Sequence, residues 1–309
     1  MQNQIINTLL QARYVLIISH YNPDADTICS SLAISNFLKE NNIKHKLYNK
    51  DKKIIPRSLD FLPLFEKITD QIPPFYDVAI YCDSATKDRT GFDAQNCLTI
   101  NIDHHQSNNF FGDFNLVDDQ KSSTAEVVFE LLNGTNQKIS KNIAMCLYVG
   151  IYDDSIGFTT PRVNGRTFEI LNRLLETKID IGYISDQYKR RESLAKYRLS
   201  SKIMQTMQLH REGTIATIYC DPIWLDETGA HVNDCDDIVD TTLNLAIVDM
   251  VFYFRIVNNK VRVSARSKGG VDVSEIAQQF NGGGHKNAAG MSIDSLDIHK
   301  SIDIVIKSI

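Results

Sequence analysis

Two short runs of acidic and imidazole residues each follow directly on an apolar segment with the composition of a β-strand. The first apolar segment is Tyr14–Ser19, and it leads into the run His20–Asp26. The second is Leu98–Ile102, and it leads into Asp103–His105. Because the carboxyl ends of parallel strands in an open α/β sheet border one crevice, we expect both runs to lie near each other. Carboxylates and imidazoles gathered in this way predict a site for divalent metal ions.

The first half of the chain alternates strand patterns with helical patterns. Strands are expected at Tyr14–Ser19, Lys44–Tyr48, Asp77–Cys82 and Leu98–Ile102, and helices near Thr27–Glu40, Val127–Leu132, Lys141–Tyr152 and Gly165–Glu176. Ser123 and Glu126 have the spacing of a capping box at the start of the second helix. Alternation of this kind favours a parallel sheet covered on both faces. We therefore predict an α/β fold with an N-terminal parallel-sheet domain.

The pattern changes near residue 190. Residues 189–212 resemble one charged helix, which we interpret as a connector that belongs to neither core. Strands are expected beyond it at Thr214–Cys220, Met250–Val257 and Lys260–Arg266, with a turn at Asn258-Asn259, and helices near Val273–Phe280 and Leu296–Ser308. The predicted organisation is an N-terminal domain at 1–188, a connector helix at 189–212 and a smaller C-terminal α/β domain at 213–309.

Composition restricts the classes of function. The net charge of −5 gives no sign of a long nucleic-acid duplex as partner, although metal ions can reverse the local field for a small anionic substrate. The six cysteines form no CxxC pair, so we expect buried thiols in a reducing compartment. The N-terminus lacks the apolar core of a signal peptide, and no apolar run approaches the roughly 20 residues of a membrane helix. These features predict a cytoplasmic protein with no membrane partner.

The spacing of His20, Asp24 and Asp26 lets three side chains that leave a strand point into one hole. One imidazole with carboxylates suits Mn²⁺ best and Mg²⁺ next, whereas zinc sites more often use cysteine or more histidines. The alternative is structural, with Asp24 or Asp26 capping the helix that starts at Thr27. A cap and a metal ligand can be the same residue, so both interpretations stay open.

Further carboxylates and imidazoles end other elements. Asp83 follows a strand and by itself would be a turn residue, whereas the adjacent polar side chains of Asp103–His105 cannot all be buried cheaply. Asp153 and Asp154 repel each other, so they indicate either a nearby cation or a solvated helix end. The patches together supply six candidate ligands, namely His20, Asp24, Asp26, Asp83, His104 and Asp154. Two metal ions about 4 Å apart, bridged by Asp83, would suffice for phosphoester hydrolysis.

The C-terminal half carries its own signal in a glycine run. Consecutive glycines let backbone N–H groups approach an anion, and Arg266 can bind a phosphate in bidentate fashion. A glycine run alone is more often a flexible turn, but the histidine directly after it favours phosphate or nucleotide binding. The candidate substrate-binding residues are Arg266, Ser267, Gly282, Gly283, Gly284 and His285.

In these residues the chain resembles the DHH/DHHA1 phosphoesterases, and among them the oligoribonuclease (nanoRNase) and pAp phosphatase group. The resemblance covers nearly the whole chain and also includes Val263–Ser267 and Gly282–Gly290. It implies that one Mn²⁺ is held by His20, Asp24 and Asp83, and the other by Asp26, Asp83, His104 and Asp154. It further implies that Asp103 orients an imidazole, that His105 contacts the scissile phosphate, and that the protein is a homodimer. Where the family commonly has Thr-Asp-Thr-Gly, this chain has Asp153–Ile156.

The resemblance implies hydrolysis of short RNA, of about two to five residues, to 5′-mononucleotides by in-line attack of a bridging hydroxide. It also implies removal of the 3′-phosphate from 3′-phosphoadenosine 5′-phosphate (pAp). One alternative is a phosphodiesterase for linear or cyclic dinucleotides such as pApA, pGpG or cyclic di-AMP. A RecJ-like exonuclease is disfavoured because a processive grip needs a basic groove. A non-catalytic nucleotide-binding protein is disfavoured by the full set of candidate ligands.

Overall fold

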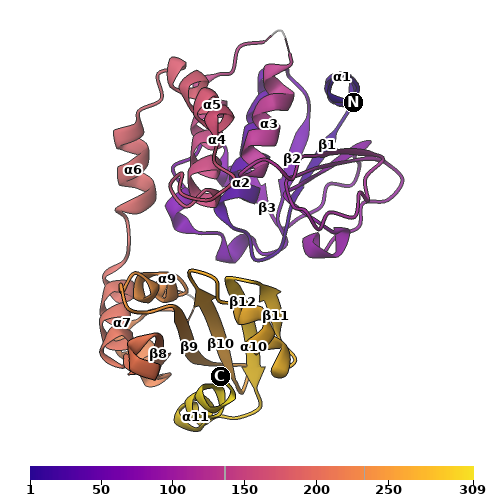
Figure 1. Cartoon of the computed structure of the whole chain (residues 1–309). Helices are drawn as coiled ribbons and strands as arrows, with labels where there is room; N and C mark the ends of the chain where they lie inside the picture. Colours follow the sequence, from indigo (N-terminus) through magenta and orange to yellow (C-terminus); the bar gives the residue numbers. More distant parts are fainter. Residues whose placement is uncertain (136, 233) are drawn as a thin grey trace. The chain divides into compact units, whose positions relative to one another are not determined.

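A computed structural model describes residues 1–135, 137–232 and 234–309 (Figure 1). Contacts divide the chain into two compact units, Met1–Arg191 and Glu192–Ile309. Each unit contains one six-stranded sheet with helices packed against it. The predicted fold class, a parallel-sheet domain followed by a second α/β domain, is confirmed.

The sheet of the N-terminal unit is parallel throughout, with strand order β3-β2-β1-β4-β5-β6. Its strands are β1 (Val15–Ser19), β2 (His45–Tyr48), β3 (Ile68–Thr69), β4 (Val78–Cys82), β5 (Leu98–Asp103) and β6 (Phe114–Val117). The order reverses direction between β1 and β4. In open α/β sheets, ligands bind beyond the carboxyl ends of the strands at such a switch point, so the topology places a candidate site after β1 and β4.

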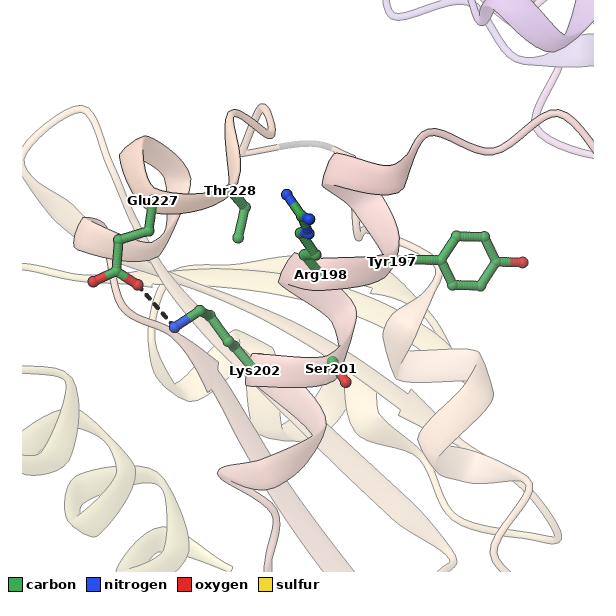
Figure 2. Close-up of a pocket in the computed structure, with 6 residues that line it drawn as sticks. All are labelled: Tyr197, Arg198, Ser201, Lys202, Glu227 and Thr228. Carbon is green, nitrogen blue, oxygen red and sulfur yellow. Dashed lines mark ion pairs between the residues drawn. The ribbon is translucent and has the colours of Figure 1, made fainter.

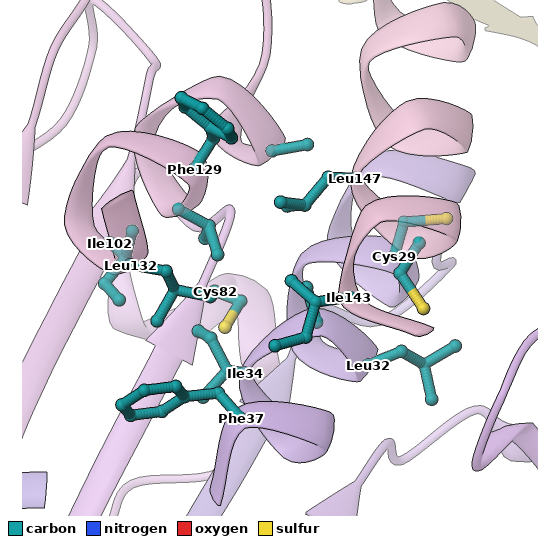
Figure 3. Close-up of a cluster of buried hydrophobic side chains, with 14 of the residues drawn as sticks. Cys29, Leu32, Ile34, Phe37, Cys82, Ile102, Phe129, Leu132, Ile143 and Leu147 are labelled. Atoms are coloured by element: carbon teal, nitrogen blue, oxygen red, sulfur yellow. The ribbon is translucent and has the colours of Figure 1, made fainter. Parts of the chain in front are cut away.

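Helices cover one face of this sheet, and loops cover the other. The helices are α1 (Gln2–Gln11), α2 (Ala25–Glu40), α3 (Thr124–Asn133), α4 (Lys141–Asp154), α5 (Gly165–Glu176) and α6 (Ile181–Lys189). They share one apolar core with the strands, part of which is drawn around Phe129 and Leu147 in Figure 3. On the opposite face, Tyr48 and Tyr81 pack against loop residues that include Phe92. Both faces are covered as predicted, but only one of them by helices.

The C-terminal unit has a mixed sheet of order β11-β12-β10-β9-β8-β7. Its strands are β7 (Gln208–His210), β8 (Ile215–Cys220), β9 (Met250–Val257), β10 (Lys260–Ser267), β11 (Gly283–His285) and β12 (Ala288–Ile293). Its helices are α7 (Leu194–Gln205), α8 (Ile223–Thr228), α9 (Ile238–Leu243), α10 (Val273–Gln279) and α11 (Ile298–Ser308). Helices α10 and α11 pack on one face of the sheet, and α7 and α9 pack on the other. The predicted turn between β9 and β10 is confirmed, since Asn258 and Asn259 have φ of 51° and 60°.

The predicted connector helix over 189–212 is wrong. Helix α6 ends at Lys189, and α7 begins after Ser193, whose side chain accepts a hydrogen bond from the Lys196 N–H. Leu199 and Ile203 of α7 lie in an apolar core of the C-terminal unit, so this helix is part of that unit. The charged stretch hides the break because its apolar periodicity continues across the serine that caps the new helix.

Short 3₁₀ turns complete the description, at Lys52–Ile54, Arg57–Leu59, Phe65–Lys67, Lys87–Thr90 and Arg211–Gly213. The six cysteines are free thiols, and all except the partly buried Cys97 are buried. Among the residues described, no helix is both long enough and apolar enough to cross a membrane.

Candidate metal centre and nucleotide-binding face

His20 follows β1 and Asp83 follows β4, so both residues stand at the switch point of the parallel sheet. The Nε2 atom of His20 lies 3.4 Å from an oxygen of Asp83 and 3.4 Å from an oxygen of Asp24. The other ring nitrogen is 2.8 Å from the carbonyl oxygen of Tyr21, which directs Nε2 at the carboxylates. His20, Asp24 and Asp83 are therefore a set of three donors that could hold one metal ion.

The geometry of Asp24 is compatible with both of the roles that the sequence leaves open. It is the N-cap of α2, and its Oδ1 accepts a hydrogen bond of 3.1 Å from the Thr27 N–H. Its Oδ2 faces His20 instead. Because each oxygen has a different partner, the cap fixes the carboxylate without occupying the oxygen that faces the metal-binding side chains.

A second set of donors consists of Asp26, His104 and Asp154. The Nε2 atom of His104 lies 3.3 Å from Asp154 Oδ2 and 3.7 Å from Asp83 Oδ1. Its Nδ1 is 3.3 Å from the carbonyl oxygen of Lys121. Asp83 thus turns Oδ2 toward His20 and Oδ1 toward His104, which is the placement expected of a carboxylate that bridges two metal ions.

The backbone at Asp83 is unusual for a buried residue. Asp83 has a φ of 57°, and its Oδ1 accepts a hydrogen bond of 2.8 Å from the Thr124 hydroxyl. Residues other than glycine adopt this left-handed region infrequently, and such conformations gather at functional sites where the surroundings enforce them. The turn after β4 therefore aims the Asp83 carboxylate at the imidazoles of His20 and His104.

The N-terminus of α3 supports the same site. The N–H groups of Thr124 and Ala125 donate to the two oxygens of Asp26, at 2.6 and 3.0 Å. Ser123 caps the helix as predicted, but Glu126 does not return to it. The Glu126 carboxylate accepts hydrogen bonds from Ser122 and Thr167 instead, so only half of the predicted capping box forms. No sequence pattern indicates the contacts of Thr124 beyond its position in that first turn.

Burial and mutual repulsion control the charges of the carboxylates. Burial, followed by the charges of Asp83 and Asp154, raises the pKa of Asp26 well above its usual range. Burial and the charges of Asp83 and Asp24 raise the pKa of Asp154 to about 8. Burial would also raise the pKa of Asp83, but its neighbouring histidines, His20 first, lower it. The site therefore concentrates more negative charge than it can hold alone, which a divalent cation would relieve.

The pKa values of the three histidines also shift in different directions. Burial alone would lower the pKa of His20, but hydrogen bonds with Asp24 and Asp83 raise it to about 10. Burial lowers the pKa of His104. Burial alone would lower the pKa of His105, but the hydrogen bond with Asp103 and the charges of Asp83, Asp103 and Asp154 together raise it.

Asp103 orients His105. Its Oδ1 lies 2.7 Å from His105 Nδ1, and its Oδ2 accepts a hydrogen bond of 2.6 Å from the Asn108 amide. His105 Nδ1 also lies 3.6 Å from Asp83, so the ring stands beside the candidate metal ligands. Because the buried Asp103 occupies Nδ1, Nε2 is the ring atom of His105 that is available to a substrate. Asn108 was not predicted, because an isolated asparagine in a loop has no distinguishing sequence pattern.

Asp153 has a different partner from Asp154. The hydroxyl of Tyr188, on α6, donates a short hydrogen bond to Asp153. The Lys189 ammonium lies 4.9 Å from the centroid of the Tyr188 ring. A cavity of about 130 Å³ adjoins this contact, and it is lined by Tyr148, Val149, Tyr152, Ile181, Ile184, Ser185, Tyr188 and Lys189. The extra carboxylate that departs from the family pattern therefore anchors α6 to the end of α4.

Ile156 is the second departure from the family pattern. It has a φ of 49° although it is β-branched, and its side chain is 73% exposed. Gly157 and Phe158 continue the left-handed backbone with φ of 66° and 69°. A glycine would adopt this conformation at little cost, so the chain stores backbone strain directly after Asp154.

Arg266 and His285 share one face of the C-terminal sheet. Arg266 on β10 stands opposite Ala288 on β12, which stands opposite His285 on β11, and residues directly opposite in a sheet share a face. The Nε atom of Arg266 lies 3.5 Å from an oxygen of Asp240 on α9. The structure thus brings two of the predicted substrate-binding side chains onto one surface.

Among the remaining predicted residues of this group, Ser267, Gly282 and Gly284 have packing reasons for their identity. The Ser267 side chain is buried and donates to the Val271 carbonyl oxygen at 2.8 Å. A Cβ at Gly282 would come within 2.3 Å of the Gly290 oxygen, and one at Gly284 within 2.4 Å of the Ala288 oxygen. Gly283 differs, because a Cβ there would meet nothing within 4 Å. Only Gly283 of the three keeps open space in front of the strand.

A larger cavity, of about 540 Å³, lies in the C-terminal unit. Figure 2 shows its lining residues, which are Tyr197, Arg198, Ser201, Lys202, Glu227 and Thr228. Lys202 forms an ion pair of 2.8 Å with Glu227 across it. None of the predicted site residues lines this cavity, so its size alone does not mark it as the place of the chemistry.

Comparison with known proteins agrees with the fold. Residues 14–151 match the DHH family, N-terminal domain, and residues 212–309 match the DHHA1 domain. The chain belongs to the DHH/DHHA1 family of phosphoesterases.

Relatives align over nearly the full chain. A Thermus thermophilus protein named bifunctional oligoribonuclease and PAP phosphatase NrnA is 29% identical, over 96% of this chain and 89% of that protein. The Bacillus subtilis protein of the same name is 27% identical, over 96% of this chain and 95% of that protein.

Two solved structures share the fold. An exopolyphosphatase-related protein from Bacteroides fragilis has a TM-score of 0.90 at 25% identity, over 99% of this chain and 95% of that chain. RecJ from Thermus thermophilus, in complex with Mn²⁺, has a TM-score of 0.57 at 16% identity, over 98% of this chain and 53% of that chain.

Proposed function

We propose that the protein is a Mn²⁺-dependent phosphoesterase that hydrolyses short oligoribonucleotides to 5′-mononucleotides and removes the 3′-phosphate of pAp. The observation that carries this proposal is the position of Asp83 between two candidate donor sets. One of its oxygens faces His20 of the first set, and the other faces His104 of the second set. The names of the Thermus thermophilus and Bacillus subtilis relatives support both substrates, because these relatives align with nearly the whole chain.

The donor chemistry fits a pair of divalent ions. In this proposal His20, Asp24 and Asp83 hold one ion, and Asp26, Asp83, His104 and Asp154 hold the other. Mixed imidazole and carboxylate donors favour Mn²⁺, with Mg²⁺ as the alternative. When bound, such a pair supplies a hydroxide near neutral pH and neutralises the charge of the phosphate.

His105 is the proposed group that contacts the scissile phosphate. Asp103 holds the proton of Nδ1, so Nε2 is the atom that donates to the phosphate and protonates the departing oxygen. The raised pKa of His105 favours the protonated form of the ring.

The proposed nucleotide-binding surface is the face of the C-terminal sheet that carries Arg266, Gly283 and His285. A guanidinium binds phosphate oxygens through two parallel hydrogen bonds. We propose that Arg266 and His285 hold a substrate phosphate. Ser267, Gly282 and Gly284 keep β10, β11 and β12 in the register that places them.

The direct test replaces two proposed metal ligands that come from different elements, and it includes a matched control variant. We expect Asp154→Ala and His104→Ala to abolish Mn²⁺-dependent turnover of pAp and pApA while the circular dichroism spectrum is retained. Asp186→Ala is the control, because Asp186 forms an exposed ion pair with Arg190 away from the donor sets. Near-normal activity of either ligand variant would show that the ligand assignment is wrong.

A further inference from the structure

A row of cationic side chains lies beside the proposed phosphate-binding row on the C-terminal sheet. Side chains alternate along a strand, so Arg262, Ser264 and Arg266 of β10 project from one face. Arg262 stands directly opposite Arg255 on β9 and Ser292 on β12. Arg255, Arg262 and Ser292 therefore make one row across three strands, which we call the distal row.

The distal row is electrostatically unbalanced. Like charges directly opposite each other on neighbouring strands destabilise a sheet. Within the described part of the chain, Asp236 is the one carboxylate that forms a hydrogen bond with either arginine. It accepts from an Nη atom of Arg255, and the charge of Arg262 also acts on it. The next carboxylate, Asp237, lies 2.9 Å from the Lys196 ammonium. Two guanidinium groups thus share a single negative charge.

Arg255 is also incompletely satisfied. Its residue surface is 5% exposed, and its Nε atom is buried without a hydrogen-bond partner. Burying an unpaired donor on a charged group costs more than burying a neutral one. Arg262 next to it is exposed. The row therefore presents an exposed cation, Arg262, beside a buried one, Arg255, whose Nε atom lacks an acceptor.

The surface between the distal row and Arg266 has little side-chain cover over β10, β12 and β11. The intervening row contains the buried Tyr253 on β9, followed by Ser264 on β10, Gly290 on β12 and Gly283 on β11. A Cβ at Gly290 would find its nearest neighbour at 3.9 Å, and a Cβ at Gly283 would find none within 4 Å. A ligand can therefore lie flat across this glycine floor, with one end at Arg266 and the other at the distal row.

We infer that the distal row is a second phosphate subsite, which binds a backbone phosphate of oligonucleotides longer than a dinucleotide. Arg262 and Arg266 are four residues apart on one strand, about 13 Å at a rise of about 3.3 Å per residue. That span exceeds the separation of adjacent phosphates, so a third nucleotide is needed to reach from one row to the other. This inference rests on the proposed function and adds to it a basis for recognising chain length.

The test compares the binding of pA, pApA and pApApA to the full chain in EDTA, where turnover is prevented, by isothermal titration calorimetry. We expect the affinity of the unmodified protein to rise from pApA to pApApA. Arg262→Ala should remove most of that increase, about 10-fold, and leave the affinity for pA unchanged. Arg198→Ala is the matched control, because Arg198 is another exposed arginine of the same unit and lines the cavity in Figure 2.

A gain of affinity provides a second readout. Asp236→Asn removes the charge that competes for Arg255, so the affinity for pApApA should rise severalfold while that for pA stays constant. A merely structural role of the distal row would not produce this increase. A uniform loss for all three ligands would contradict the inference.

Different results would overturn the distal subsite and the proposed function. Equal affinities for pApA and pApApA, or an equal loss in Arg198→Ala and Arg262→Ala, would overturn the distal subsite even if Mn²⁺-dependent hydrolysis is observed. A length-dependent increase that needs Arg262, without hydrolysis after Mn²⁺ is added, would support the subsite and reject the proposed enzymatic activity.

Discussion

Metal binding should release protons and should therefore strengthen steeply with pH. Without metal, the pKa of His20 is raised to about 10 and that of Asp154 to about 8. His20 belongs to one proposed metal site and Asp154 to the other. Each must lose its proton to act as a ligand, so binding of two ions releases at least about two protons at pH 7. One proton is worth about 1.36 kcal/mol per pH unit, and the combined binding constant should rise about 100-fold per unit below pH 8.

The same pKa shifts determine whether the metal-free protein becomes more or less stable as the pH rises. The raised pKa of His20 makes a stabilising contribution that is complete below its ordinary value of 6.5 and is lost as the pH rises toward 10. The raised pKa of Asp154 acts in the same direction between its ordinary value of 3.8 and about 8. The metal-free protein should therefore become less stable from pH 5 to pH 9, whereas the stabilisation by Mn²⁺ should grow.

Calorimetric titration with Mn²⁺ in buffers of different ionisation enthalpy counts these protons directly. Thermal unfolding at pH 6, 7 and 8, with Mn²⁺ and with EDTA, measures the accompanying stability. Asp186→Ala should behave like the unmodified protein in both experiments. A binding constant for Mn²⁺ that does not depend on pH would refute the assigned ligands and the reasoning from their buried charges. Release of almost no protons at pH 7 would refute them as well.

Two further predictions concern the departures from the family pattern. Tyr188→Phe should lower the free energy of unfolding by about 1.5–3 kcal/mol, because a buried hydrogen bond to the Asp153 carboxylate is lost. Chemical denaturation measures this, and the loss should shrink when Asp153→Thr is also present, since the partner is then gone. Ile156→Gly should raise the free energy of unfolding by about 0.5–1 kcal/mol, because relief of roughly 1–2 kcal/mol of backbone strain outweighs the entropy of the added glycine. Destabilisation by Ile156→Gly would show that the left-handed backbone is not strained.

The candidate metal ligands could be predicted from the sequence because they follow or begin strongly apolar elements. His20, Asp83 and His104 follow central strands, and the parallel order of the sheet brings strand ends together whatever the loops do. The order of the strands itself was not predictable, since it depends on which edges the crossover helices cover. The site could therefore be anticipated as a group before its geometry was known.

The supporting residues were not predictable for a physical reason. Thr124 and Asn108 contact Asp83 and Asp103 through single hydrogen bonds that no local pattern encodes. Tyr188 reaches Asp153 across 35 residues of sequence. Such contacts arise only from tertiary packing, so periodicity and capping signals do not predict them. The same limit explains the connector, where the break before α7 depends on one serine within a continuous charged pattern.

Activity on substrates of different length tests the central claim most directly. Mn²⁺-dependent product formation would be measured side by side from pAp, pApA, a five-residue RNA and a 24-residue RNA. We predict rapid turnover of pAp and of both short RNAs, with mononucleotides as the RNA products and the long strand left intact. Efficient digestion of the 24-residue RNA, or no Mn²⁺-dependent turnover of any of the four, would contradict a two-metal phosphoesterase for short nucleotides.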